Sequence, residues 1–176
     1  MSIRPTVGCD PGKTGGLALL EDEALVDLIL MPSYEGPSRG FKLAFRKDGT
    51  PYQRAVKGKQ FVDFVKVRDI LQEWRWRYLE PPDIVIEDVH AMPEQGVTGA
   101  FSFGFDTGHV HGIALGLGYA PRKVHGATWK AESGVSALKE TSIAKAKGIW
   151  THALLDKDGC AEAALIARWG FRHRAP

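Results

Sequence analysis

Short apolar runs separated by turn residues occupy the first thirty positions of the chain. Residues 3–9, 16–20 and 24–30 are each predicted to form a strand, and the acidic residues 21–23 form the turn between the last two. Pro and Gly punctuate residues 10–16, which predicts a tight turn there. Because short strands joined by tight turns pair antiparallel, the chain is predicted to begin with three antiparallel strands.

The pattern changes after residue 60, where apolar residues recur at helical spacing as far as Tyr78. Residues 83–87 form a short apolar run ending in an acid, which is typical of a buried central strand. The remaining pattern predicts a glycine-rich helix over 100–117, a short strand over 120–124, and helices over 139–154 and 160–169. This helix contains Phe101, Phe103 and Phe105, and we expect them to pack in the core rather than to face solvent. The whole order indicates a mixed α/β domain, with a central sheet of about five strands flanked by helices.

A basic segment rich in Pro and Gly, residues 32–59, interrupts this order. Between residues 37 and 60 there are seven basic residues and one acid, Asp48. The seven are Arg39, Lys42, Arg46, Lys47, Arg54, Lys57 and Lys59. Three aromatic residues lie among them, a combination that suits phosphate neutralisation and base stacking. Asp48-Gly49 favours a hairpin turn, so residues 41–56 are predicted to form a basic β-hairpin or a flexible arm. The role of this insertion stays open at this point. It could contact DNA, form part of a dimer contact, do both, or be a solvated surface loop.

Length and composition narrow the class of protein. With 176 residues, of which 44% are apolar, the chain is predicted to fold as one domain over residues 1–176. No apolar run approaches the roughly 18 residues that cross a bilayer, and no signal-peptide pattern is present, so we expect a cytoplasmic protein with no membrane partner. Cys9 and Cys160 have neither a disulfide pattern nor metal-ligand spacing, and are interpreted as reduced, partly buried thiols. The net charge of +2 does not by itself indicate a nucleic-acid partner.

Four acids occupy positions where they are expected to meet. Asp10 ends the first predicted strand, Glu87 ends the central one, and Glu162 lies near the start of the last helix with Asp158 one turn earlier. If the two strands are parallel neighbours, their acids emerge at one end of the sheet, and a helix crossing that end adds the other two. Clustered carboxylates repel one another unless a cation neutralises them, and hard divalent cations prefer such oxygen ligands. Taken singly, each acid has an ordinary alternative as a solvated loop residue, a partner of the helix dipole or a helix N-cap.

Four segments resemble, in their order and spacing, the motifs of RuvC-type Holliday junction resolvases, and the second segment is most similar to phage and prophage members. The segments are Val7 to Gly16, with its Asp-Pro-Gly turn, Ile84 to Pro93, Pro121 to Lys130, and Asp158 to Ala167. The resemblance touches every major element except the insertion. It implies an RNase H-like fold, a homodimer, cleavage of four-way DNA junctions, and dependence on Mg²⁺ or Mn²⁺ with two ions per active site. Carried over by motif, Asp10, Glu87 and Glu162 would be catalytic residues that bind the metal.

The fourth acid departs from the pattern of the family. Many relatives place an Asp three residues before the final acid, where this chain has Gly159. Asp158 stands four residues before Glu162, returns to about the same helix face, and is the candidate for the fourth catalytic metal ligand. Asp156 is the weaker alternative. The final acid is Glu here, where cellular members of the family have Asp, so we expect a metal preference different from theirs.

Basic residues near these motifs are further candidates. Lys145, on a predicted helix, is expected to approach the scissile phosphate and stabilise developing charge. Lys130 is a candidate for anchoring a neighbouring phosphate, as is Lys13 in the first turn. The alternative for each lysine is a solvated helix face or a turn residue. His90 and His125 are interpreted as ordinary structural histidines rather than as groups that orient a metal ligand.

The leading hypothesis is therefore a structure-selective endonuclease that resolves four-way junctions by metal-assisted phosphodiester hydrolysis. A broader nuclease that also cuts flaps and forks is the nearest alternative. A fragment of an actin-like ATPase or sugar kinase has a similar glycine-rich turn after its first strand, but those proteins need two such domains. A catalytically inactive DNA-binding module is disfavoured because Asp10, Glu87 and Glu162 are all intact.

Overall fold

A mixed five-stranded sheet forms the centre of the protein in the computed structural model, which describes residues 5–38, 40–89 and 96–174. Its strands are β1 (Pro5–Asp10), β2 (Gly16–Glu21), β3 (Ala24–Leu30), β8 (Asp83–Asp88) and β9 (Arg122–His125). They lie in the order β3-β2-β1-β8-β9, with β1, β2 and β3 antiparallel and with β8 and β9 parallel to β1. The predicted mixed sheet with three antiparallel opening strands is confirmed.

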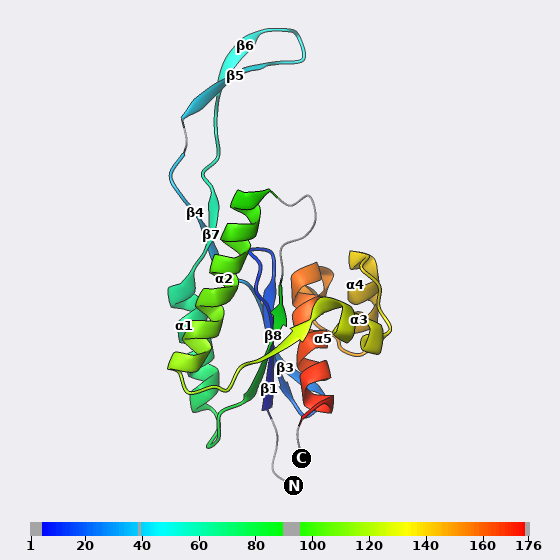
Figure 1. Cartoon of the computed structure of the whole chain (residues 1–176). Coiled ribbons are helices and arrows are strands. Elements are labelled where there is room, and N and C mark those ends of the chain that lie inside the picture. The colour runs from blue at the N-terminus through cyan, green and yellow to red at the C-terminus, as the bar shows by residue number, and fades with distance from the viewer. Residues whose placement is uncertain (1–4, 39, 90–95, 175–176) are drawn as a thin grey trace.

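Helices cover both faces of this sheet (Figure 1). One face carries α1 (Phe64–Trp76) and α2 (Val97–Gly116), and the other carries α3 (Gly126–Ser133), α4 (Lys139–Lys147), the short helix η1 (Ala153–Asp156) and α5 (Asp158–Arg172). Side chains alternate along the strands between the two resulting cores. Leu17 and Leu19 of β2 pack towards α1 and α2, whereas Ala18 and Leu20 pack towards α5. The nearly continuous apolar strands follow from this double burial.

Small residues bring α5 unusually close to the sheet. A Cβ atom added to Gly8 of β1 would lie 2.1 Å from the carbonyl oxygen of Ala163 and 2.4 Å from the amide nitrogen of Ala167. At Gly16 of β2 it would lie 2.9 Å from the Cα of Cys160. Larger residues at these positions would push the helix away from the strands. The glycines therefore determine how near the acids of α5 lie to the end of β1.

The basic insertion forms an arm that projects from the body of the protein (Figure 1). Its base is a ribbon of β4 (Ser33–Glu35) and β7 (Gln60–Val62), and its outer part is an antiparallel hairpin of β5 (Phe41–Phe45) and β6 (Pro51–Ala55). Gly49 in the connecting turn has a φ of 84°, a left-handed conformation that Gly adopts without strain. The predicted hairpin is confirmed, and the ribbon at its base was not predicted.

Several predicted boundaries were wrong for local reasons. The helix predicted from residue 60 begins at Phe64, because residues 60–62 pair with β4 and the Asp63 side chain accepts a hydrogen bond from the Lys66 amide as the helix cap. The helix predicted over 139–154 ends at Lys147, before Gly148, and α3 was missed altogether.

The glycine-rich helix exposes two side chains that were assigned to the core. Phe101 is 75% exposed and Phe105 is 49% exposed, so the core interpretation was wrong for both. Cys9 and Cys160 are buried and free. Among the described residues, no helix combines the length and apolar character needed to cross a membrane.

Candidate active site

The ends of β1 and β8 bring the first two acids together. These strands are parallel neighbours, and Cys9 is paired with Ile86 in their register. The next residue on each strand is the acid, so Asp10 and Glu87 leave the sheet side by side at the same end. This is the arrangement that the sequence predicted.

Helix α5 begins at the same end of the sheet and contributes two more carboxylates. Asp158 is its first residue, and Glu162 follows one turn later with only 8% of its surface exposed. Between them, Gly159 lies against the loop after β1, where an added Cβ would be 2.2 Å from the Thr14 carbonyl oxygen. Since this contact leaves no space for a side chain, an acid three residues before Glu162 would have no room here.

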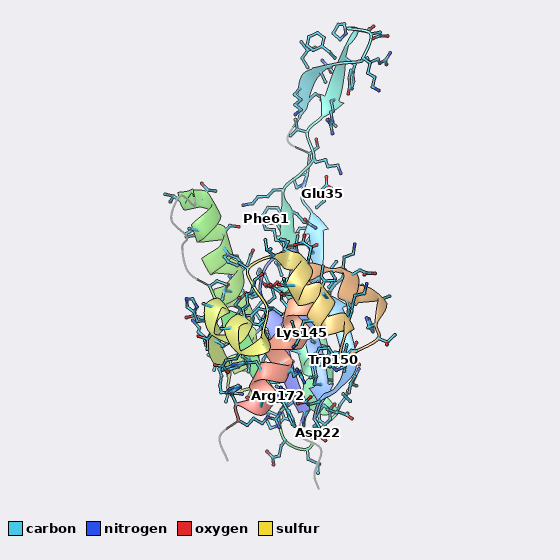
Figure 2. The ribbon with its side chains drawn as sticks, turned by 90° about the vertical axis from the view of Figure 1, so that its right-hand side faces the viewer. Asp22, Glu35, Phe61, Lys145, Trp150 and Arg172 are labelled. Atoms are coloured by element: carbon cyan, nitrogen blue, oxygen red, sulfur yellow. The ribbon has the colours of Figure 1, made fainter. Side chains whose placement is uncertain are left out.

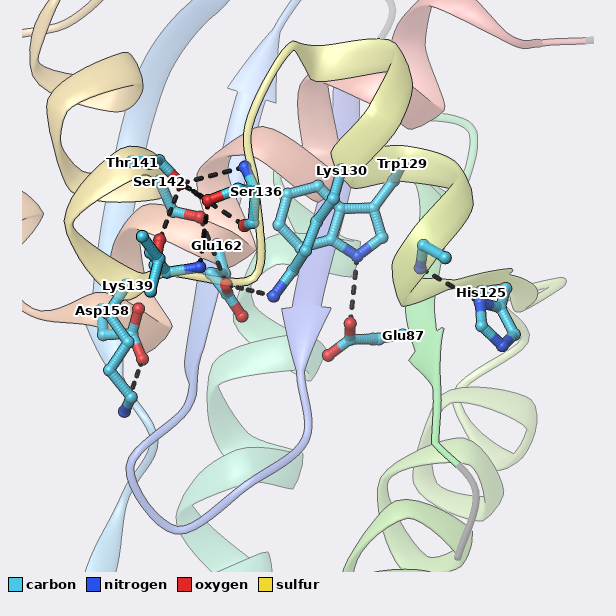
Figure 3. Close-up of polar contacts among 12 residues, drawn as sticks. Glu87, His125, Trp129, Lys130, Ser136, Lys139, Thr141, Ser142, Asp158 and Glu162 are labelled. Carbon is cyan, nitrogen blue, oxygen red and sulfur yellow. Dashed lines mark hydrogen bonds and ion pairs between the residues drawn. The ribbon is translucent and has the colours of Figure 1, made fainter. Parts of the chain in front are cut away.

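Side chains of α3 and α4 hold two of the acids (Figure 3). The indole Nε1 of Trp129 donates to Glu87 Oε1 at 3.1 Å. The neighbouring Lys130 extends its Nζ to 2.6 Å from Glu162 Oε1, and the buried Ser142 hydroxyl donates to the same oxygen at 3.2 Å. Adjacent residues of one helix thus orient carboxylates from two different elements.

Burial and the charges of neighbouring acids raise the pKa values of Asp10 and Glu87. Burial, followed by the charges of Glu87 and Glu162 and then of Asp158, raises the pKa of Asp10 to about 8. The pKa of Glu87 is also raised, chiefly by burial and further by Glu162, although the Trp129 hydrogen bond opposes the change. All four acids therefore lie close enough to share one field, although they come from three separate parts of the chain.

The set of donors fits a hard divalent cation. It consists of carboxylate oxygens, and the Oδ1 atom of Asp158 is buried without a hydrogen-bond partner, while its Oδ2 pairs with Lys139 Nζ at 2.8 Å. Within the described ranges, no three His, Cys, Asp or Glu side chains are arranged so that they could together bind a metal ion. Lys130 and Lys139 supply the positive charge at Glu162 and Asp158 instead. A cation bound here would compete with these two ammonium groups for the same oxygens.

Two other predicted site residues lie farther from the acids. Asp156 is exposed in η1 and pairs with Lys147. Asp158, not Asp156, contributes to the field at Asp10, so Asp158 is the better candidate for the fourth acid. Lys145 is exposed on α4, and its Nζ approaches Gly134 at the end of α3. No ion pair joins Lys145 to an acid of the cluster among the described residues.

A pocket of about 450 Å³ lies against the loop that follows Asp10. Lys13 and Thr14 of that loop line it together with Lys59 from the base of the arm, and with Ser102 and Asp106 of α2. Asp106 is only 6% exposed, and burial raises its pKa although Lys13 and Lys59 oppose that change. The pocket therefore places two of the predicted DNA-binding lysines, Lys13 and Lys59, beside the loop that follows Asp10.

Sequence reasoning missed several groups at this end of the sheet. Asp106 lies inside a glycine-rich helix without a recognisable motif, and Ser142 and Lys139 lie on a helix whose packing the pattern does not reveal. Trp129 was noticed only as part of a family segment. His125 accepts a hydrogen bond from the Ala127 amide and so caps α3, consistent with a structural role.

The remaining predicted DNA-binding residues lie on the arm. Lys42, Arg46, Lys47 and Arg54 are exposed on or beside the hairpin, and Lys57 lies between it and the base. Arg39 and His90 fall outside the described residues.

The fold is similar to that of known RuvC structures. A structure of T. thermophilus RuvC in complex with a Holliday junction substrate superposes with a TM-score of 0.50 and 16% sequence identity, over 93% of this chain and 90% of that one. A second Thermus thermophilus RuvC structure gives a TM-score of 0.46 and 19% identity, over 95% and 97% of the two chains. No protein-family model and no curated protein sequence matches the chain. The mixed sheet with its flanking helices has the RuvC-type, RNase H-like fold.

Proposed function

We propose that this protein is a metal-dependent endodeoxyribonuclease that resolves four-way DNA junctions, as a RuvC-type enzyme of the phage branch. The observation that carries the proposal is the convergence of Asp10, Glu87, Glu162 and Asp158 at one end of the sheet, on a fold shared with RuvC. The structure with that fold was solved with a Holliday junction substrate, which supports the same class of substrate here. The phage branch rests on the second sequence motif, and a cytoplasmic location is supported by the two free thiols.

We assign metal binding and catalysis to the four acids. These acids would hold two Mg²⁺ or Mn²⁺ ions, whose Lewis acidity would activate water and stabilise the leaving oxygen in phosphodiester hydrolysis. Trp129 fixes the orientation of Glu87 through its indole N–H, and Ser142 does the same for Glu162. These hydrogen bonds limit the rotation of the two carboxylates, which favours one geometry of the ligands.

The basic residues are assigned to the phosphate backbone. Lys13 and Lys59 line a pocket beside the Asp10 loop, where they would neutralise a phosphate next to the one that is cut. Lys130 lies between the acid cluster and the pocket next to Glu87, and is assigned to a neighbouring phosphate. Lys145 is assigned to developing charge at the scissile phosphate, which it would reach from the exposed face of α4. The basic residues of the arm, Arg39 included, extend this contact along the DNA.

We further propose that the protein acts as a homodimer of single-domain chains, which would place two sites on opposite strands of a junction. Support comes from a row of exposed glycines at four-residue intervals along α2. The row consists of Gly104, Gly108, Gly112 and Gly116, and a Cβ added to any of them would meet nothing within 4 Å. Each such glycine costs about 0.5–1 kcal/mol relative to Ala in a helix, which is difficult to explain unless another surface approaches closely. The exposed rings of Phe101 and Phe105 lie beside this row and would be covered by the same second copy.

The proposal is tested by incubating the protein with a synthetic four-way junction, a flap, a fork and a linear duplex, each with Mg²⁺, Mn²⁺ or EDTA. We expect symmetric cuts in the junction that require the metal, leave 5′-phosphate and 3′-hydroxyl ends, and spare the duplex. Efficient cutting of flaps and forks would indicate the broader nuclease instead. The Glu87→Gln variant should bind the junction without cutting it, and metal-dependent cleavage by that variant would contradict the role given to Glu87.

A further inference from the structure

The hairpin of the arm has two chemically different faces. Residues directly opposite each other in an antiparallel pair share a face, and neighbours along a strand alternate. The register pairs Phe41 with Ala55, Leu43 with Gln53 and Phe45 with Pro51, which together form one face. It pairs Lys42 with Arg54 and Ala44 with Tyr52 on the other. The guanidinium of Arg46 lies 5.8 Å from the centre of the Tyr52 ring and adds to this basic face.

The apolar face is open to solvent. Phe41, Leu43 and Phe45 are 70%, 65% and 64% exposed, and none of them belongs to either hydrophobic core. Figure 2 shows the side chains of the hairpin projecting into solvent, well beyond Glu35 and Phe61 at the base of the arm. Three large apolar side chains in a row on an isolated hairpin are the mark of a contact surface.

The cations on and beside the hairpin form no ion pair with an acid of the described residues. Among the described residues, Lys42, Arg46, Lys47 and Arg54 form no ion pair, whereas Lys130, Lys139 and Lys147 of the body each pair with an acid. Residues 37–60 carry seven of the 23 basic residues and one of the 21 acids, so the rest of the chain is net negative. The arm therefore presents positive charge to a partner outside the chain.

One partner can contact both faces, because they are separated only by the thickness of a two-stranded ribbon. Such a partner offers anionic groups and flat apolar surfaces a few ångströms apart. Nucleic acid does so wherever base stacking is interrupted, since the phosphates remain next to the exposed base faces. A continuous duplex hides those base faces, and a branch point exposes them.

The arm is also continuous with the candidate active site. Its base is stiffened by the stacked rings of Tyr34 and Phe61, whose centres are 5.6 Å apart, and Lys59 lies 5.6 Å above the Phe61 ring. Lys59 lines the pocket next to Lys13, in the loop that follows Asp10. Lys13 and Lys59 therefore form a basic connection between the loop after Asp10 and the base of the arm, along which a DNA strand would run.

We propose that Phe41, Leu43 and Phe45 pack against unstacked bases at the branch point of a DNA junction, while the opposite face of the hairpin binds the adjacent phosphates. The inference rests on the proposed function, because it takes branched DNA as the substrate. It assigns the recognition of the branch to the insertion and leaves cleavage to the acids of the sheet.

The test compares two triple variants of the full-length protein in EDTA, which prevents cleavage. The apolar-face variant is F41S/L43S/F45S, the basic-face variant is K42Q/R46Q/R54Q, and L79S is the control because Leu79 is fully exposed on the loop after α1. Affinity is measured by fluorescence anisotropy for a four-way junction and a linear duplex at several salt concentrations. A second junction carries 2-aminopurine at the branch point.

The apolar-face variant should lose about 5- to 150-fold in junction affinity, the loss of one stacked base, with duplex affinity nearly unchanged. The branch-point 2-aminopurine signal of the wild type should disappear in this variant and persist in L79S. The basic-face variant should bind both DNAs more weakly and lower the slope of log affinity against log salt by about 2–3. All variants should retain the thermal midpoint of the wild type, because the hairpin lies outside both cores.

Junction affinity and 2-aminopurine signal equal to the wild type in the apolar-face variant would overturn the inference and leave the proposed function intact. A wild type with no preference for the junction over the duplex would refute the proposed function itself. Loss of self-association in the apolar-face variant by light scattering would assign the face to a second copy. Loss of binding to anionic phospholipid vesicles would assign it to a membrane, and either result overturns the inference.

Discussion

Replacing Asp10 by Asn should stabilise the metal-free protein at alkaline pH while abolishing cleavage. Burial and the neighbouring carboxylates raise the pKa of Asp10 from 3.8 to about 8. Between about pH 4 and pH 8, Asp10 therefore keeps its proton in the folded protein, whereas the unfolded chain has already released it. The stability associated with Asp10 is fully present below pH 4 and is lost as the pH rises through 8, by up to about 1.4 kcal/mol per pH unit.

The size of the stability change follows from the two pKa values of Asp10, 3.8 in the unfolded chain and about 8 in the folded protein. At pH 8 the deprotonation of Asp10 has removed on the order of 5 kcal/mol of folding free energy relative to a carboxyl with an ordinary pKa. An amide in the same place carries no charge, although its own burial costs about 1–3 kcal/mol. We therefore expect a net gain of about 2–4 kcal/mol, which corresponds to a rise of roughly 5–15 °C in Tm for a chain of this size.

The assay is a series of thermal melts of the wild type and D10N from pH 5 to pH 9, in EDTA and in Mn²⁺. In EDTA the advantage of D10N should grow with pH and vanish near pH 5. In Mn²⁺ the wild type should recover much of the difference, because an ion that binds the folded protein stabilises it. Equal midpoints for the two proteins at pH 8 in EDTA would refute the electrostatic account of the acid cluster.

Three further predictions test separate parts of the site. Gly159→Asp places an acid three residues before Glu162 but should lower Tm, because its Cβ would lie 2.2 Å from the Thr14 carbonyl oxygen; thermal melts measure the loss, expected to be about 1–3 kcal/mol. Trp129→Phe keeps an aromatic ring but removes the hydrogen bond to Glu87, so single-turnover cleavage should slow about 10-fold or more with unchanged junction affinity. Gly108→Leu meets open space within one chain and should leave the fold intact, yet light scattering should show monomers if the glycine row is the dimer contact.

The positions of Asp10 and Glu87 were predictable because they depend on strand order alone. An acid at the end of each of two short apolar runs is visible in the sequence, and parallel neighbouring strands place both acids at one edge of the sheet. The register of Cys9 with Ile86 confirms this for Asp10 and Glu87. The hairpin was predictable for a similar reason, since Asp48-Gly49 specifies its turn locally.

The positions of Asp158 and Glu162, and of the side chains that contact them, depend on packing, which hydrophobic periodicity does not reveal. The approach of α5 to the sheet is determined by Gly8 and Gly16, and the sequence shows these two glycines only as members of the segment Val7 to Gly16, without indicating that a helix packs on them. The same applies to α3, whose eight residues show little amphipathic pattern although Trp129 is fully buried. Partners such as Ser142 become visible only when two helices are placed over the last acid.

The positions of the lysines connect the state of the acids to the proposed contact with DNA. Lys130 neutralises Glu162 and Lys139 neutralises Asp158, but Asp10 has no such partner among the causes of its raised pKa. If the four acids held a divalent cation, as proposed, Lys130 and Lys139 would no longer be needed to balance the charge of Glu162 and Asp158. Lys130 is 22% exposed and lines the pocket beside Glu87, so an ammonium group released from Glu162 is already next to the surface where a phosphate would lie. Lys130 would therefore act as the counter-ion of Glu162 without the metal and as a phosphate ligand with it, so its ion pair in the structure is compatible with the role predicted from sequence.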